Sequence, residues 1–194
     1  WAWAMDKPRN SGILYHHGNG KGHEFNLHEG NLGSYWTKKA GADIPYILTS
    51  DLADSVHLDY ASYASLIPTI SDAMPKFDPS APFQRGEDDG EWKIVTADPV
   101  VERAAGEWNS LELICWENYA MHIVNGDICF ILVNGHYQDK GELFPLTQGR
   151  LALQSEGSEI FFKDVQLQLL DELPAIFEDF LQQHQLKVPN FSED

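Results

Sequence analysis

The chain has 194 residues, a length that suits one domain, and 43% of them are hydrophobic, which is enough apolar material for a core. Thirteen Lys and Arg residues against 30 Asp and Glu residues give a net charge of −17, so the surface repels nucleic-acid phosphates and anionic lipid headgroups. We therefore expect neither nucleic acid nor a membrane as a partner, and no apolar run approaches the roughly 20 residues that span a bilayer.

The beginning of the chain predicts a β-hairpin. Residues 1–5 alternate large and small side chains as a strand does, and we expect one more strand upstream of them. Residues 11–16 predict a strand, which a glycine-rich turn joins to a second strand at residues 23–28. Side chains on these two strands then lie within reach of one another.

The region from Thr37 to Asp89 loses this alternation. Its Pro, Ser, Asp and Ala residues show only a weak period, and the region is too long for a simple connection in a compact domain. We expect an irregular excursion over one face of the protein, with short helical turns near residues 50–55 and 60–66.

Alternating apolar segments return later in the chain, separated by Gly, Asn and Asp turn residues. The predicted strands cover residues 92–96, 111–116, 120–124, 128–133, 151–156, 160–162 and 165–169. The second, third and fourth of these form an antiparallel meander in this interpretation. Many short strands at such spacing are typical of an all-β fold, a two-sheet antiparallel β-sandwich.

A change of period marks a C-terminal helix. Apolar residues recur every three or four positions from about Asp171 to His184, which predicts one amphipathic helix with Pro174 in its first turn and Asp171 as part of its cap. The apolar face, expected to dock on the sandwich or on a second subunit, carries Leu173, Ile176, Phe177, Phe180 and Leu181. The solvated face carries Glu172, Glu178, Asp179 and Gln183.

The chain therefore divides into a sandwich domain, residues 1–170, and a C-terminal helix and tail, residues 171–194. A homo-oligomer could form through the helix.

Two cysteines, Cys115 and Cys129, exclude a disulfide-rich scaffold and a four-cysteine zinc site. They fall on the first and third strands of the predicted meander, roughly 9 to 10 Å apart, which is beyond the reach of a disulfide. We expect two buried thiols that are not bonded to each other.

The second strand of the hairpin carries the densest group of reactive side chains. Period-2 alternation places Glu24, Asn26 and His28 on one face and the apolar residues between them on the other. A solvent-facing strand can show such a row without any function. What favours a site is that Tyr15, His16 and His17 lie just across the predicted hairpin.

A second polar set comes from the predicted strand at residues 151–156. Gln154 and Glu156 alternate with core leucines and face outward, and His122 joins the same polar face in this interpretation. The alternative is that His122 is a structural histidine of a half-buried strand. The sequence has no metalloprotease, P-loop, nucleophile-elbow or dinucleotide-binding motif.

Glu24, Asn26 and Glu29 have the spacing E-x-N-x-x-E, which resembles the E-x-D-x-x-E strand of laminarinase-type family 16 glycoside hydrolases. In that family a bulge returns the last Glu to the catalytic face, where two carboxylates act as nucleophile and general acid. Asn26 replaces the middle acid here. The charge pattern that tunes the carboxylate pair is therefore changed, which disfavours ordinary double-displacement hydrolysis.

Several stretches, in the right order, resemble the motifs of the 3-keto-disaccharide hydrolase domain family. They are Pro8–His16, Glu24–Gly30 with Gly33–Trp36 behind it, Gly106–Glu112, His122–Gly126, and Leu151–Gly157 with Glu159–Val165 behind it. The resemblance covers about residues 1–170, with a looser match over residues 37–91 and no match in the C-terminal helix. Asn26 stands where this family usually has Gln, and either amide can hydrogen-bond a hydroxyl.

The resemblance implies a concanavalin-like, jelly-roll sandwich whose concave face holds a sugar. It places the family's first strands upstream of Trp1, and it implies an extracytoplasmic location, periplasmic or secreted, because members are commonly exported, often from Bacteroidetes or Planctomycetes. We assign no cofactor. Concanavalin-like folds often carry a structural divalent metal, which stays an alternative, although no acidic loop here has the EF-hand pattern.

The activity that the resemblance implies is cleavage of a 3-keto-glycoside. A ketone at C3 acidifies the C2 hydrogen, so a base removes that proton, the glycosidic oxygen leaves C1, and water then adds back. The candidates for proton transfer are Glu24, His28, Glu29, His122 and Glu156. The candidates for binding the substrate are Tyr15, His16, Asn26, Trp36 and Gln154.

Two other functions fit the same residues. A non-catalytic, lectin-like carbohydrate-binding module needs only a shallow polar and aromatic face, whereas an eliminating enzyme needs titratable groups that converge. A conventional glycoside hydrolase would place Glu24 at about 5 Å (retaining) or about 6.5 to 9.5 Å (inverting) from a second carboxylate, Glu29 or Glu156. We expect convergence on one cleft of Glu24, Asn26, His28, Gln154 and Glu156, with at least one of Tyr15, His16 and His122.

Overall fold

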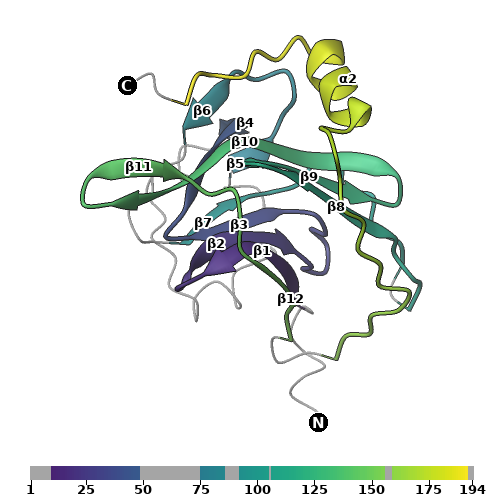
Figure 1. The fold of residues 1–194 in the computed structure, drawn as a ribbon. Helices are drawn as coiled ribbons and strands as arrows, with labels where there is room; N and C mark the ends of the chain where they lie inside the picture. Colours follow the sequence, from purple (N-terminus) through teal and green to yellow (C-terminus); the bar gives the residue numbers. More distant parts are fainter. Residues whose placement is uncertain (1–9, 49–74, 86–91, 105, 156–158, 192–194) are drawn as a thin grey trace.

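A computed structural model describes residues 10–48, 75–85, 92–104, 106–155 and 159–191. In this part of the chain two antiparallel sheets stack as the layers of a sandwich, and a helix lies against the outer side of one of them (Figure 1). The predicted all-β, concanavalin-like two-sheet sandwich is confirmed.

The first sheet has the strand order β12-β1-β2-β3-β7. Its strands are β1 (Gly12–Gly18), β2 (Lys21–Asn26), β3 (Tyr35–Lys38), β7 (Trp92–Val95) and β12 (Arg150–Leu153). β1 and β2 form the predicted hairpin. Asn19 and Gly20 connect them with φ angles of 54° and 73°, the left-handed conformation that a two-residue hairpin turn requires.

The second sheet has the order β5-β4-β10-β9-β8, and in addition β6 pairs with β4 and β11 with β10. Its strands are β4 (Gly41–Leu48), β5 (Pro75–Phe77), β6 (Phe83–Arg85), β8 (Leu111–Trp116), β9 (Tyr119–Val124), β10 (Asp127–Asp139) and β11 (Glu142–Pro145). The predicted meander of β8, β9 and β10 is confirmed. Its last strand continues past the predicted end at Val133, to Asp139.

The core lies between the sheets, where aromatic rings from both layers meet. Tyr35 of β3 stacks on Phe130 of β10 with ring centroids 5.1 Å apart, and Phe25 of β2 stacks on His122 of β9 at 4.4 Å. These contacts identify the inner face of the first sheet. Glu24 precedes Phe25, and Trp36 follows Tyr35. Because side chains alternate along a strand, Glu24 and Trp36 face away from the second sheet.

The predicted irregular excursion from Thr37 to Asp89 is wrong for its described parts, which contain the end of β3 and all of β4, β5 and β6. β4 pairs with β10 on one side and with β5 and β6 on the other. Asp43 and Pro45 hide this strand in the sequence, since charged residues and proline are rare inside a sheet. The helical turns predicted near residues 50–55 and 60–66, and the strand predicted at residues 1–5, lie outside the described residues.

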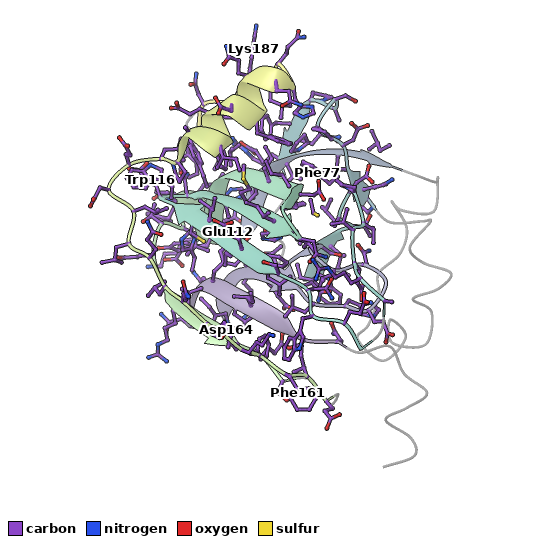
Figure 2. The ribbon with its side chains drawn as sticks, turned by 90° about the vertical axis from the view of Figure 1, so that its right-hand side faces the viewer. Phe77, Glu112, Trp116, Phe161, Asp164 and Lys187 are labelled. Atoms are coloured by element: carbon purple, nitrogen blue, oxygen red, sulfur yellow. The ribbon has the colours of Figure 1, made fainter. Side chains whose placement is uncertain are left out.

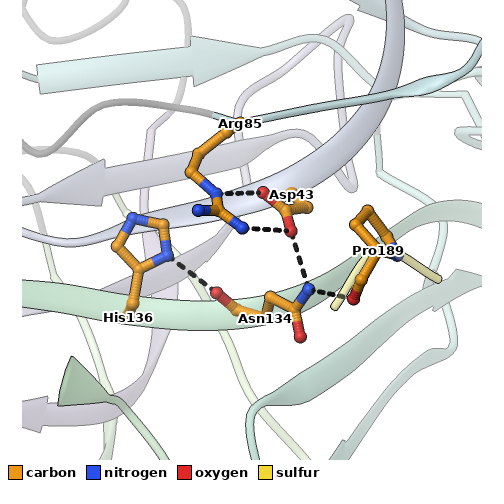
Figure 3. A network of polar contacts seen from close by, with 5 residues as sticks. All are labelled: Asp43, Arg85, Asn134, His136 and Pro189. Carbon is orange, nitrogen blue, oxygen red and sulfur yellow. Dashed lines mark hydrogen bonds and ion pairs between the residues drawn. The ribbon is translucent and has the colours of Figure 1, made fainter. Parts of the chain in front are cut away.

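The charge of Asp43 is matched by groups distant in sequence (Figure 3). Arg85 of β6 donates hydrogen bonds from Nε at 3.0 Å and Nη2 at 3.4 Å, and Asn134 of β10 donates from Nδ2 at 2.7 Å. The same Asn134 Nδ2 donates to the carbonyl oxygen of Pro189 at 2.8 Å. The Asp43 carboxylate therefore links β4 to β6 and β10, and Asn134 also hydrogen-bonds the C-terminal tail.

Replacing Asp43 by Ala is expected to lower the free energy of unfolding by about 3 kcal/mol, because Arg85, whose side chain is 21% exposed, loses the carboxylate that balances its charge. Urea unfolding followed by circular dichroism measures the change. The double variant Asp43→Ala/Arg85→Met, which removes both charges, should recover part of the loss. A loss below about 0.5 kcal/mol, the usual size for a surface substitution, would contradict this account of the pair.

The strands predicted at residues 160–162 and 165–169 are wrong, because the described segment from residue 159 to 171 contains no strand. Its apolar residues do alternate, yet Val165, Leu167 and Leu169 are 66, 76 and 86% exposed. In Figure 2, Phe161 projects from the lower end of this segment, away from the sheets. Period alone does not make a strand, since the backbone also needs a neighbouring strand to bond with.

The C-terminal helix, α2 (Ala175–Gln183), packs on the sandwich, as predicted. Phe177 stacks on Tyr119 of β9 with centroids 5.6 Å apart, and Phe180 lies 6.4 Å from Phe77 of β5. Two details are wrong: the helix has its N-cap at Pro174 instead of near Asp171, and Ile176 is 42% exposed instead of docked. Leu173 and Leu181 are partly buried against the core. Among the described helices, none has the length and apolar character that crossing a bilayer requires.

Cys115 and Cys129 are free thiols, on β8 and β10, with β9 between those strands as predicted. Cys129 is buried, whereas Cys115 is only partly so. Desolvation raises the pKa of Cys115 to about 12 and that of Cys129 to about 11. Both sulfurs are therefore protonated, poorly nucleophilic groups at neutral pH.

Candidate functional site

The hairpin of β1 and β2 positions the central polar residues of the candidate site. In its register Gly12 pairs with Asn26, and Leu14 pairs with Glu24. Alternation along β2 sends Glu24 and Asn26 to the outer face of the first sheet, because Phe25 between them faces the core. The predicted separation of polar and apolar faces on β2 is therefore what the structure has.

Four polar side chains gather around Gly12, and we call them the Glu24 cluster: Asn10, Glu24, Asn26 and Gln154. Asn26 Nδ2 donates hydrogen bonds to Glu24 Oε1 and to Asn10 Oδ1, both at 3.2 Å. Gln154 comes from just beyond β12, and its backbone N donates to the carbonyl oxygen of Gly12 at 2.8 Å.

Gly12 shows how closely the cluster is packed. A methyl group at this position would lie 2.6 Å from Glu24 Cδ and 2.7 Å from Gln154 Oε1. The carboxylate of Glu24 and the amide of Gln154 thus both lie over the Cα of Gly12. Only glycine leaves the room for two polar groups to approach the strand this closely.

Trp36 of β3 borders the cluster. It pairs with Glu24 across the ladder between β2 and β3, so the two side chains share the outer face. Leu14 of β1 stands opposite Glu24 on the other side. Glu24 therefore lies in a row between an indole and an aliphatic side chain.

The cluster is removed from water. Glu24, Asn26 and Trp36 are 3, 1 and 4% exposed. Within the described residues, Asn26 Oδ1 and Gln154 Oε1 are buried acceptors without a hydrogen-bond partner. A ligand with hydroxyl donors can satisfy buried acceptors of this kind, and these hydrogen bonds make its binding more favourable.

His28 and Glu29 follow β2 directly. His28 is buried at 2% exposure, and desolvation lowers its pKa, partly offset by hydrogen bonding and charge from Glu29. Its imidazole is thus neutral at pH 7 and can accept a proton. Glu29 is exposed, at the turn where Asn31 N bonds to His28 O.

Tyr15 and His122 lie between the sheets, on the face opposite Glu24, so the expectation that they face the cleft is wrong. The hydroxyl of Tyr15 is 2.9 Å from His122 Nε2, and His122 Nδ1 is 2.9 Å from the carbonyl oxygen of Gly33. Both side chains are at most 1% exposed. The alternative interpretation, a structural histidine satisfied by its neighbours, describes His122.

His16 is also directed away from the Glu24 cluster. Its φ is 47°, at a register shift between Tyr15 and Gly18, and its ring lies 5.6 Å from Tyr15 and 6.2 Å from His23 between ring centroids. His23 Nδ1 is in turn 2.8 Å from the hydroxyl of Tyr35. Tyr15, His16, His23, Tyr35 and His122 thus form an internal histidine and tyrosine cluster.

The internal histidines predict a loss of stability in acid. Burial lowers the pKa of His122 to about 3 and that of His23 well below its usual value. A histidine of the unfolded chain has a pKa of about 6.5, so below that pH the unfolded state binds more protons than the folded state. The free energy of unfolding, which has its full value above pH 6.5, therefore falls on acidification. From pH 7 to pH 5, His122 alone should lower the free energy of unfolding by about 2 kcal/mol.

Urea unfolding of the wild type and His122→Gln at both pH values measures this term. The variant should lose about 2 kcal/mol of the pH-dependent difference. Equal pH dependence in the wild type and His122→Gln would contradict the prediction.

Glu156, the remaining predicted site residue, lies outside the described residues. In the described ranges, no group of three or more His, Cys, Asp and Glu side chains is placed to hold a metal ion.

Asn10 of the Glu24 cluster, and Gly12 beneath it, were not expected from the sequence as parts of the site. The signal was available, because a glycine inside a predicted strand often marks the close approach of another group. Gln154 and Glu24 are predicted to converge, but their meeting over Gly12 depends on the pairing of β12 with β1.

The fold and this geometry define a concanavalin-like β-sandwich protein with a buried carboxylate and amide cluster on the outer face of one sheet. The model of the 3-keto-alpha-glucoside-1,2-lyase-like domain matches residues 1–168, and the chain belongs to this family. The resemblance drawn from the sequence motifs is thereby confirmed. No curated protein and no solved structure matches the chain.

Proposed function

We propose that the protein cleaves 3-keto-glycosides by elimination followed by hydration, at the Glu24 cluster. The observation that carries the proposal is the position of the Glu24 carboxylate, buried beside two amides that offer unsatisfied acceptors. Family membership supports the type of substrate. A carbohydrate is accordingly the proposed partner.

The first half of the reaction needs a base. We assign this role to Glu24, which takes the proton at C2 of the 3-keto sugar while the electron pair is delocalised onto the C3 oxygen. The pair then forms the C1–C2 double bond as the C1–O bond breaks, and the aglycone leaves with a proton from a general acid. The candidates for that acid are His28, Glu29 and Glu156, and His28 can serve only after it has taken up a proton, since its lowered pKa leaves the imidazole neutral at pH 7.

The second half is hydration. Water adds across the C1–C2 double bond, its oxygen to C1 and a proton to C2, which gives the free 3-keto sugar. The base that took the C2 proton can return it at this step. The amides of Asn26 and Gln154 bind sugar hydroxyls or the enolate oxygen, and the indole of Trp36 supplies an apolar wall.

Incubation with a chromogenic 3-keto-glucoside, and with the same glucoside unoxidised, tests the proposal. We expect release of the aglycone from the ketone only, because the C2 hydrogen of the parent is not acidic. Release from both would indicate conventional two-carboxylate hydrolysis. Release from neither would overturn catalysis.

A lectin-like module is the second candidate, and the unpaired acceptors of the cluster favour it as much as they favour binding of a substrate. Calorimetric titration with the same two sugars separates the candidates, since a module would bind without turnover. For either function we propose an extracytoplasmic location, periplasmic or secreted, where such sugars are met.

A further inference from the structure

Ser11 joins the Glu24 cluster to the edge strand that supplies Gln154. Its hydroxyl donates a hydrogen bond to the carbonyl oxygen of Gln154 at 2.6 Å. Its own carbonyl oxygen accepts a bond from Leu27 N at 2.8 Å, from the end of β2. Ser11 therefore lies between the two segments that carry the cluster.

Gln154 depends on these bonds for its position. β12 ends at Leu153 and lies at the edge of its sheet, where its ladder is to β1. Beyond that end, the backbone of Gln154 is fixed by Ser11 Oγ and by the carbonyl oxygen of Gly12. The side chain lies over Gly12, beside the carboxylate of Glu24.

Ser11 itself cannot touch a ligand on the outer face. It is 0% exposed, and alternation places it with Ile13 on the inner face of the sheet, opposite Gly12. Any effect of its hydroxyl on the cluster must pass through the main chain of Gln154.

We infer that Ser11 is a positioning residue, which holds Gln154 in register with Glu24 so that both can contact one sugar. The inference rests on the proposed function for its kinetic consequence, but its geometric content, the placement of Gln154, can be measured separately.

Ser11→Ala is compared with Thr37→Val, a matched control. Thr37 is also buried, at 2% exposure, and its Oγ1 also donates to a backbone carbonyl of the same sheet, that of Gly22 at 3.0 Å, but it pairs with inward-facing His23 and does not contact β12. We expect kcat/KM for the 3-keto-glucoside to fall about tenfold in Ser11→Ala, as loss of one hydrogen bond implies, and to stay within about twofold in Thr37→Val. Ser11→Cys, which keeps a weak donor, should lie between the wild type and Ser11→Ala and replaces the latter if it does not fold.

A double-mutant cycle distinguishes positioning from a general loss of stability. In a Gln154→Ala background the Ser11 substitution should have no further effect on kcat/KM, since the side chain through which it acts is gone. An equal fold-change in both backgrounds, or the same loss in Thr37→Val, would overturn the inference.

The side-chain amide signals of Gln154 in a nitrogen-proton spectrum give a readout without turnover. They should shift in Ser11→Ala and not in Thr37→Val. If the wild type cleaves no 3-keto-glucoside, the proposed function fails, and the spectrum alone decides: shifted signals support positioning of Gln154 by Ser11, and unchanged signals overturn it.

Discussion

Glu24→Gln is expected to reduce turnover of a 3-keto-glucoside by about 10²- to 10⁴-fold, the usual contribution of a general base. Gln has the shape of Glu and keeps the oxygen that accepts the hydrogen bond from Asn26 Nδ2. It cannot take the proton from C2. The fold should persist, so the circular dichroism spectrum and the thermal midpoint should stay close to those of the wild type while aglycone release is lost.

Glu112→Gln is the control for this experiment. Glu112 lies on β8 of the second sheet and is exposed (Figure 2), so its replacement removes the same single charge far from the Glu24 cluster. Its turnover should equal that of the wild type. If Glu24→Gln keeps more than about a tenth of the wild-type kcat, the assignment of Glu24 as base is wrong, since even a weak general base contributes about 10²-fold.

Gly12→Ala is expected to lower kcat/KM by about 10²-fold while leaving the protein folded, because a displacement of reacting groups by about 1 Å has this effect. The new methyl group would overlap Glu24 Oε1 and lie 2.7 Å from Gln154 Oε1. Both atoms are at the ends of flexible side chains. They can move aside without breaking the sheet, and in doing so they leave the arrangement around Gly12.

Gly18→Ala on the same strand separates this effect from the general influence of alanine on β1. A methyl group at Gly18 would meet nothing within 4 Å. Steady-state kinetics and urea unfolding of both variants give the comparison. Wild-type kinetics in Gly12→Ala would refute the packed arrangement of Glu24 and Gln154, and a large loss of stability would refute the claim that these side chains absorb the change.

Period-2 alternation predicted the central part of the site correctly. On β2 it separates Glu24 and Asn26 from Phe25, and the structure has the same division. The pattern is informative there because one face of the strand packs on the second sheet and the other carries polar groups. The sequence of a single strand contains that contrast.

The same pattern failed for His122. Its neighbours Met121 and Ile123 were taken as the core face, but all three side chains are at most 4% exposed. α2 covers the face of β9 that carries Tyr119, and the first sheet covers the other. Both faces of β9 carry apolar residues, with Ala120 and Val124 on the face of His122, so a single histidine does not indicate direction. The partners of His122, Tyr15 and Gly33, are far away in sequence.

The sequence by itself determined the sandwich, its first hairpin, the meander, the C-terminal helix and the faces of Glu24 and Asn26, because each depends on side-chain period and turn residues within a few positions. Only the tertiary structure decided that residues 159–171 form no strand and that Asp43 belongs inside a sheet. It also decided that Gln154 meets Glu24 over Gly12. These outcomes depend on which strands become neighbours, and hydrogen bonds between strands join residues that local patterns do not relate.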